Sequence, residues 1–207
     1  LFLESTLLDT LRNEYVDMDI ESICKYFSIK NYSINDDGSI DVDGNVNLRY
    51  TRLTKLPLKF GKVTGDFYCS QNNLTTLEGC PKFVGGVFSC SGNQLTTLEG
   101  GPKTVLGEYY CSNNQLKTLE GGPEVVIGGY YCYNNKLVSF KGFPEDFDGY
   151  ISIIDNPVYN LIENIPQEKW NKFIYWCNEF DAIDDQGKVI PERMEEVYHK
   201  LGLEYED

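Results

Sequence analysis

The stretch "CSQNNLTTLEGCPKF" at residues 69–83 returns as "CSGNQLTTLEGGPKT" at 90–104 and as "CSNNQLKTLEGGPEV" at 111–125. A more divergent copy, "CYNNKLVSFKGFPED", occupies residues 132–146. With the cysteine as position zero, the same frame runs back to Leu48 and forward to Ile153 without an insertion. A fixed period in the low twenties predicts a solenoid, in which each repeat forms one coil of a continuous stack.

Two positions of the frame are apolar in every repeat, and they predict a short strand. Position zero holds Leu, Cys or Ile, and position minus two holds Val, Phe, Tyr or Ile. Alternate residues of a strand share a face, so both positions point inward, and strands of successive repeats stack about 4.8 Å apart as a parallel sheet. We expect the asparagine at plus three to turn inward and satisfy buried backbone groups. Gly and Pro fix the return loop, and Thr51 marks an atypical first repeat.

From position minus two to plus eight the repeat reads aromatic-x-Cys-x-x-Asn-x-Leu-x-x-Leu. This pattern resembles the leucine-rich repeat signature L-x-L-x-x-N-x-L over about residues 44–160. The resemblance implies an α/β fold, a leucine-rich repeat solenoid whose short parallel β-sheet lies on the concave face. It also implies a protein-binding scaffold. The compact return loop, "EGxPxxVxG", is similar to the repeats of bacterial and phage-borne proteins.

We expect one contiguous domain in three parts. Residues 1–47 form an N-terminal cap, with a helical segment and a β-hairpin that turns at Asp37-Gly38. Residues 48–158 hold the repeats, and residues 159–207 form an acidic helical C-terminal cap. Caps are expected because the end repeats of a solenoid expose apolar surface. Hydrophobic spacing predicts helices within 4–28 and over 158–164, 167–181 and 191–201.

The formal net charge is −14, which argues against nucleic-acid binding, because that affinity rests on Lys and Arg meeting phosphates. Residues 49–156 carry ten acidic and ten basic side chains, so the whole excess lies in the two flanks. No apolar run approaches the roughly 20 residues of a membrane span. The first ten residues, "LFLESTLLDT", are too acidic for a signal peptide.

The seven cysteines allow a metal site, a disulfide ladder or a core position. Zinc sites need cysteine pairs two to four residues apart, and this sequence has none. Bridges between neighbouring coils would distort the strands. Leu48 and Ile153 occupy the same frame position, which a core accepts and a metal does not. We therefore interpret the repeated cysteines as core and expect no metal and no cofactor.

Nothing in the sequence predicts a catalytic site. His199, the only histidine, is expected on the surface of the last helix, and Cys177 in a helix core. A calcium loop in "IDVDGNVNL" is unfavourable, because valine holds the position that must be glycine. We expect a protein that is not an enzyme.

A tyrosine-rich face is the candidate binding site. Residues at minus three, minus one and plus one are expected to point away from the core, and they include serines such as Ser70, Ser89 and Ser112. Tyrosine gives large contact area at low entropy cost, although β-surfaces also favour tyrosine without any partner. The residues predicted to bind a partner are Tyr68, Glu108, Tyr110, Tyr131, Tyr133 and Tyr150.

These features predict a non-catalytic scaffold that recognises a protein partner with a basic surface. The resemblance suggests an inhibitor or adaptor of bacterial or phage origin, which acts on a host defence or regulatory protein in the cytoplasm. The alternatives are a structural or virion-associated module, and a small-molecule sponge with a pocket between the tyrosines and a cap. The sequence leaves the oligomeric state open.

Overall fold

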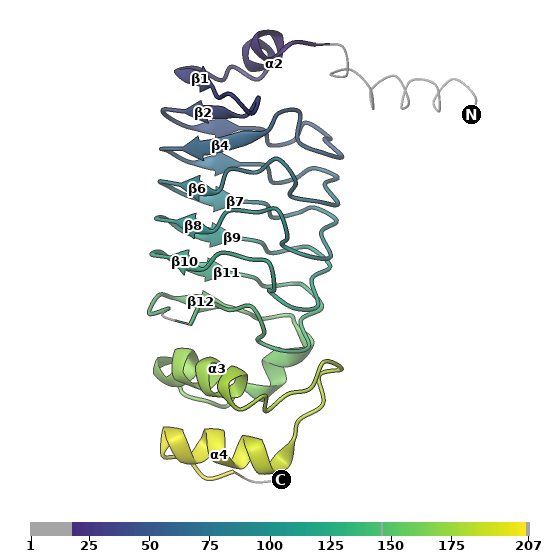
Figure 1. Cartoon of the computed structure of the whole chain (residues 1–207). Helices are drawn as coiled ribbons and strands as arrows, with labels where there is room; N and C mark the ends of the chain where they lie inside the picture. Colours follow the sequence, from purple (N-terminus) through teal and green to yellow (C-terminus); the bar gives the residue numbers. More distant parts are fainter. Residues whose placement is uncertain (1–17, 146, 206–207) are drawn as a thin grey trace, which may run out of the picture.

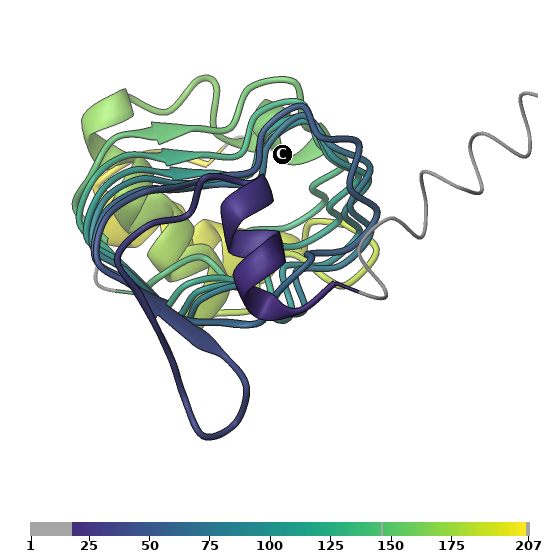
Figure 2. The same ribbon diagram turned by 90° about the horizontal axis from the view of Figure 1, so that it is seen from above.

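The computed structural model describes residues 18–145 and 147–205, and it shows a parallel β-solenoid of stacked 21-residue coils (Figure 1). We number each coil by its residue at position zero, so coil 69 holds Cys69. Viewed along the stack, the coils superimpose closely (Figure 2). The repeat period of the sequence is therefore the period of the structure.

The predicted strands form one parallel sheet, which we call sheet B. Neighbouring strands pair with a shift of one repeat, so that Tyr109 lies between Phe88 and Tyr130. The residues at positions minus two and zero are buried, which confirms the predicted register. The strands of sheet B are β3 (Val46–Asn47), β5 (Phe67–Tyr68), β7 (Phe88–Ser89), β9 (Tyr109–Tyr110), β11 (Tyr130–Tyr131) and β12 (Ile151–Ser152).

A second sheet, sheet A, occupies the part of each repeat that the sequence analysis assigned to a return loop, and that assignment was wrong. Val63, Val84 and Val105 of these strands are fully buried. Corners of three residues join the two sheets, and the Gly107 N–H there donates to the Gly86 carbonyl at 3.0 Å. The strands of sheet A are β1 (Tyr32–Ile34), β2 (Ile40–Val42), β4 (Phe60–Val63), β6 (Phe83–Val84), β8 (Thr104–Val105) and β10 (Val125–Val126).

The stack is nearly straight in Figure 1, so sheet B does not lie on a pronounced concave face. From β4 to β10 in sheet A, and throughout sheet B, neighbouring strands pair with the same 21-residue shift. A solenoid curves when its two sides rise by different amounts per coil. Here both sides rise by one strand spacing, about 4.8 Å, and the curvature implied by the leucine-rich repeat resemblance is absent.

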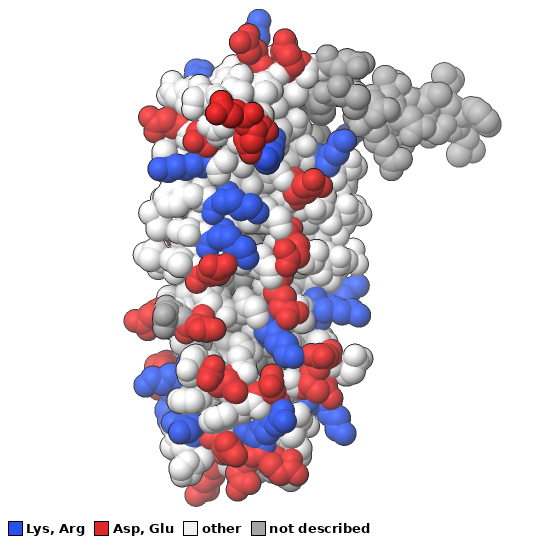
Figure 3. All heavy atoms as spheres, viewed as in Figure 1, with Lys and Arg blue, Asp and Glu red and all other residues white. Residues whose placement is uncertain are grey.

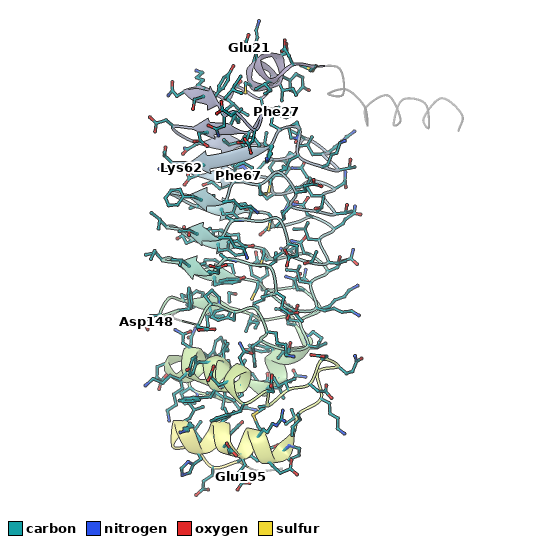
Figure 4. The ribbon with its side chains drawn as sticks, viewed as in Figure 1. Glu21, Phe27, Lys62, Phe67, Asp148 and Glu195 are labelled. Atoms are coloured by element: carbon teal, nitrogen blue, oxygen red, sulfur yellow. The ribbon has the colours of Figure 1, made fainter. Side chains whose placement is uncertain are left out.

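Aromatic rings stack through the core from coil to coil. The centres of the Phe67 and Phe88 rings lie 5.8 Å apart, those of Phe88 and Tyr109 5.3 Å, and those of Tyr109 and Tyr130 4.9 Å. All four side chains are fully buried. Figure 4 shows the contrast between Phe67, inside the stack, and Lys62, at the outer edge of sheet A. The aromatic column is therefore the spine of the core.

The side chain of Cys80 takes a position where, in coil 111, the space is occupied by the hydroxyl group of Tyr130. The equivalent residues of coils 90 and 111 are Gly101 and Gly122. A Cβ on Gly122 would lie 3.3 Å from the hydroxyl oxygen of Tyr130. Next to Cys80 the following coil supplies Phe88, which has no hydroxyl group. Cys80 is therefore explained by packing, like the cysteines at position zero.

The asparagine at plus three turns inward and satisfies buried backbone groups, as predicted, and it also joins each coil to the one before it. The Asn114 Oδ1 accepts the Leu95 N–H at 3.0 Å, and its Nδ2 donates to the carbonyls of Cys90 at 3.2 Å and Cys111 at 3.1 Å. Asn72, Asn93, Asn135 and Asn156 repeat these bonds. In the first coil, the Thr51 hydroxyl donates instead to the Leu48 carbonyl at 2.8 Å.

The N-terminal end contains the predicted hairpin, in which β1 pairs antiparallel with β2. Figure 2 shows this hairpin projecting sideways from the stacked coils. Helix α2 (Ile20–Tyr26) precedes it, and the Asp19 side chain accepts the Ser22 N–H at its N-terminus at 2.8 Å. The rest of the helix predicted within 4–28, up to residue 17, lies outside the described residues.

The C-terminal end carries the helices that the sequence predicts. They are η1 (Pro157–Leu161), η2 (Gln167–Lys169), α3 (Trp170–Glu179) and α4 (Pro191–Leu201). Phe173 packs edge-on against Phe140 of coil 132, with ring centres 5.9 Å apart, and Cys177 is buried as expected. The α3 side chains share one hydrophobic core with the coils. The exact domain boundaries and the capping role stay predictions.

Candidate protein-binding face

The outward side of sheet B brings most of the predicted site residues together. The Tyr110 and Tyr131 rings are stacked, with centres 4.4 Å apart and planes 7° apart, and the Tyr150 ring lies 5.8 Å from Tyr131. Tyr68 is separated from this group by Ser89 in the intervening strand. We call the whole set the tyrosine face, and its members are Tyr68, Glu108, Tyr110, Tyr131, Tyr133 and Tyr150.

The glycine at minus three in coil 132 makes room for the Tyr131 ring. A Cβ on Gly129 would lie 2.7 Å from Cε2 of Tyr131. The equivalent residues of coils 69 and 111 are Asp66 and Glu108, so the ring takes the place of an acidic side chain. The sequence pattern places Gly129 at an outward position of the frame, but it does not predict this role. The signal in the sequence that could have indicated this role is the pair of tyrosines at minus one and plus one of the same coil, Tyr131 and Tyr133.

A cation is already stacked on the N-terminal part of the face. Cζ of Arg49 lies 4.2 Å from the centre of the Tyr68 ring. The Tyr68 hydroxyl donates to Asp66 Oδ2 at 3.1 Å, and Asp66 Oδ1 accepts the Val87 N–H at 2.8 Å.

Burial and neighbouring charge make the Tyr110 hydroxyl a weaker acid than that of an ordinary tyrosine. Burial, the Glu108 carboxylate and the neighbouring Tyr131 together raise the pKa of Tyr110 to about 12, and burial is the largest cause. Burial, together with the Asp66 carboxylate, also raises the pKa of Tyr68, while Arg49 opposes that shift. Both hydroxyl groups are therefore neutral donors at physiological pH.

This raised pKa predicts an alkaline transition that belongs to Tyr110. The ordinary pKa of tyrosine is 10.0, so the fold favours the neutral form. The stabilising contribution is present below about pH 10 and is lost as the pH rises towards about 12. Ultraviolet titration of wild type and Tyr110→Phe should differ by one phenol ionising near pH 12. Glu108→Gln should lower that midpoint, and an unchanged midpoint would refute the role of Glu108.

Three serines predicted to lie on the exposed patch are in fact buried. Ser70 is 7% exposed, Ser89 8% and Ser112 1%. Ser89 pairs with Tyr68 on one side and Tyr110 on the other, so larger side chains flank it. The surface available to a partner is therefore narrower than the sequence predicts, and the tyrosine rings dominate it.

The remaining reactive groups lie apart from the face. All seven cysteines are buried free thiols, and burial raises the pKa of Cys90 and Cys111 well above the ordinary value. His199 is exposed on α4. Among residues 18–145 and 147–205, no group of three or more His, Cys, Asp or Glu side chains is placed to hold a metal ion. No helix within those ranges is long and apolar enough to cross a bilayer.

Among the residues that the structure describes, two hollows bear on the small-molecule alternative. One of about 490 Å³ lies against sheet A, beside Lys59, Cys80 and Lys82. The other, of about 390 Å³, lies where Tyr150 meets Trp170 and Asn171 of α3. The small-molecule alternative requires a pocket between the tyrosines and the C-terminal helices, and the second hollow is at that place.

Charged side chains of both signs alternate along the repeats on the side shown in Figure 3, and acidic groups gather at the end formed by α4.

A comparison with protein-family models, curated proteins and solved structures found no match to this chain. The structure itself shows a parallel β-solenoid with a 21-residue period. The leucine-rich repeat assignment stays a prediction.

Proposed function

We propose that this chain is a non-catalytic scaffold of the leucine-rich repeat type, which recognises a protein partner through its tyrosine face. The stacked run of Tyr110, Tyr131 and Tyr150 on adjacent strands is the observation that carries the proposal. Aromatic side chains held on a rigid sheet lose little entropy on binding, and tyrosine is enriched among residues that dominate binding energy.

The partner presents a basic surface and acts in the cytoplasm. Asp66 and Glu108 give the face negative charge, and the whole chain carries a net charge of −14. Seven free thiols suit a reducing compartment. By resemblance to compact bacterial and phage repeats, the protein is an inhibitor or adaptor that occupies a host defence or regulatory protein. A structural or virion-associated module is the rival reading, and particle proteomics separates the two.

The double variant Tyr131→Ala/Tyr133→Ala tests this proposal. Truncating a tyrosine at the centre of the interface costs at least about 1 kcal/mol of binding free energy. The double substitution therefore weakens binding by roughly thirtyfold or more. Tagged protein is incubated with host lysate, and the captured partner is quantified by mass spectrometry. Circular dichroism should show an unchanged fold, because both side chains point outward from the core.

Tyr175→Ala is the matched control, because this tyrosine is 36% exposed on α3, outside the tyrosine face. It should capture as much partner as wild type. Equal capture by the double variant and the control would show that the tyrosine face is not the binding site.

A further inference from the structure

Two coils of the tyrosine face repeat one arrangement of side chains. Coil 69 has Asp66 at minus three and Tyr68 at minus one, and coil 111 has Glu108 and Tyr110 at the same positions. The strands before them differ: Asn47 pairs with Tyr68, whereas Ser89 pairs with Tyr110. The first arrangement is therefore an internal template for the second.

In the template, the coil before the tyrosine supplies a guanidinium group. Arg49 follows Asn47 by two residues, and its Cζ lies 4.2 Å from the centre of the Tyr68 ring. Its Nε donates to Asn47 Oδ1 at 3.2 Å, which holds the side chain over the ring. Tyrosine, carboxylate and arginine thus form one group, in which Asp66 accepts the Tyr68 hydroxyl at 3.1 Å.

In the second arrangement the arginine position holds Ser91. The Ser91 hydroxyl oxygen lies 2.9 Å from that of Ser112, so the Ser91 side chain lies close to the surface of the sheet. The Tyr131 ring covers one side of Tyr110, and of the described residues no other ring or cation stacks on it. The other side of the Tyr110 ring faces the strand of Ser89, whose side chain is too short to cover it.

The Glu108 carboxylate lacks a cation as well. It forms no ion pair or hydrogen bond with any residue in 18–145 or 147–205. Asp66, by contrast, accepts both the Tyr68 hydroxyl and the Val87 N–H. Glu108 is therefore the carboxylate of this face that is left for a partner.

We propose that the place above Ser91, beside the Tyr110 ring and the Glu108 carboxylate, binds an arginine side chain of the protein partner. This inference rests on the proposed function and gives the partner's basic surface a specific residue. A planar guanidinium group stacks on an aromatic face and pairs with a carboxylate through two parallel N–H donors. The compact ammonium group of lysine does not reproduce both contacts. The partner's arginine thus occupies the place that Arg49 occupies two coils earlier.

The test uses two capped tripeptides as probes, Gly-Arg-Gly and Gly-Lys-Gly, titrated into the full chain. The ring signals of Tyr110, assigned by comparison with Tyr110→Phe, are followed by NMR. The arginine peptide should shift these signals at lower concentration than the lysine peptide, by at least about threefold. Glu108→Gln should weaken the response to the arginine peptide.

Ser91→Arg provides the sharper variant, because it places the chain's own arginine where Arg49 lies in the template. It should abolish the response of Tyr110 to the arginine peptide. Gln115→Arg adds the same charge at an exposed position outside the face and should leave the response unchanged. Glu108→Gln keeps the test decisive if Ser91→Arg does not fold.

Equal responses to both peptides, or equal losses in Ser91→Arg and Gln115→Arg, would overturn the arginine site. A failed titration alongside loss of partner capture in Tyr131→Ala/Tyr133→Ala would remove the arginine site and leave the tyrosine face standing. Failure of both experiments would remove the proposed function as well.

Discussion

Asn114→Ala is expected to lower the free energy of unfolding by roughly 3–5 kcal/mol, because the substitution leaves several buried backbone groups without partners. The lost partners are the Leu95 N–H and the carbonyls of Cys90 and Cys111, at 3.0, 3.2 and 3.1 Å. The bonds to Leu95 and Cys90 connect coil 111 to coil 90, so the damage falls on the stacking of the coils. Chemical denaturation followed by circular dichroism measures the effect.

Gln115→Ala is the control, because Gln115 is the next residue but lies exposed. Its amide oxygen accepts a hydrogen bond from the Lys136 ammonium at 3.3 Å, and loss of the side chain should change the stability by less than about 0.5 kcal/mol. Similar denaturation midpoints for Asn114→Ala and wild type would contradict the role of the asparagine column.

Gly142→Ala is expected to cost roughly 3 kcal/mol for two independent reasons. The residue has φ +82°, a conformation that costs an L-residue about 1–2 kcal/mol. Its added Cβ would also overlap the backbone of Leu119 and Glu120 in the preceding coil, and forced overpacking typically costs about 1–3 kcal/mol. Thermal or chemical unfolding of the purified variant measures the loss.

Gly38→Ala separates the two causes. Gly38 has φ +75°, but nothing lies within 4 Å of the Cβ that alanine would add. It should therefore lose only the conformational part, about 1–2 kcal/mol. Equal losses at the two glycines would show that the coils do not approach as closely as the structure has them.

The sequence predicts the coil period, sheet B, the asparagine bonds and the β1–β2 hairpin, because each depends on a residue type that recurs at a fixed spacing. The strands β4, β6, β8 and β10 of sheet A were missed because they show no alternation of apolar and polar residues. A single buried valine, such as Val84, marks each of these strands. Its pairing partners come from neighbouring coils, which local patterns do not reveal.

The candidate site, like the fold, was predicted only in part from the sequence. The frame gave the outward positions of Tyr110, Tyr131 and Tyr150, but it could not give the burial of Ser89 or Ser112, because exposure depends on the side chains in the neighbouring coils. The stack of Arg49 on Tyr68 depends on a rotamer and on the bond to Asn47. Residue spacing places such groups within reach of one another, and packing decides whether they meet.

The central claim is that the tyrosine face binds a protein partner, and the dissociation constant of the purified complex tests it most directly. Calorimetric titration should give a constant at least about thirtyfold weaker for Tyr131→Ala/Tyr133→Ala than for wild type. Tyr175→Ala should bind as wild type does. Wild-type affinity in the double variant, with a correctly folded protein, would contradict the account.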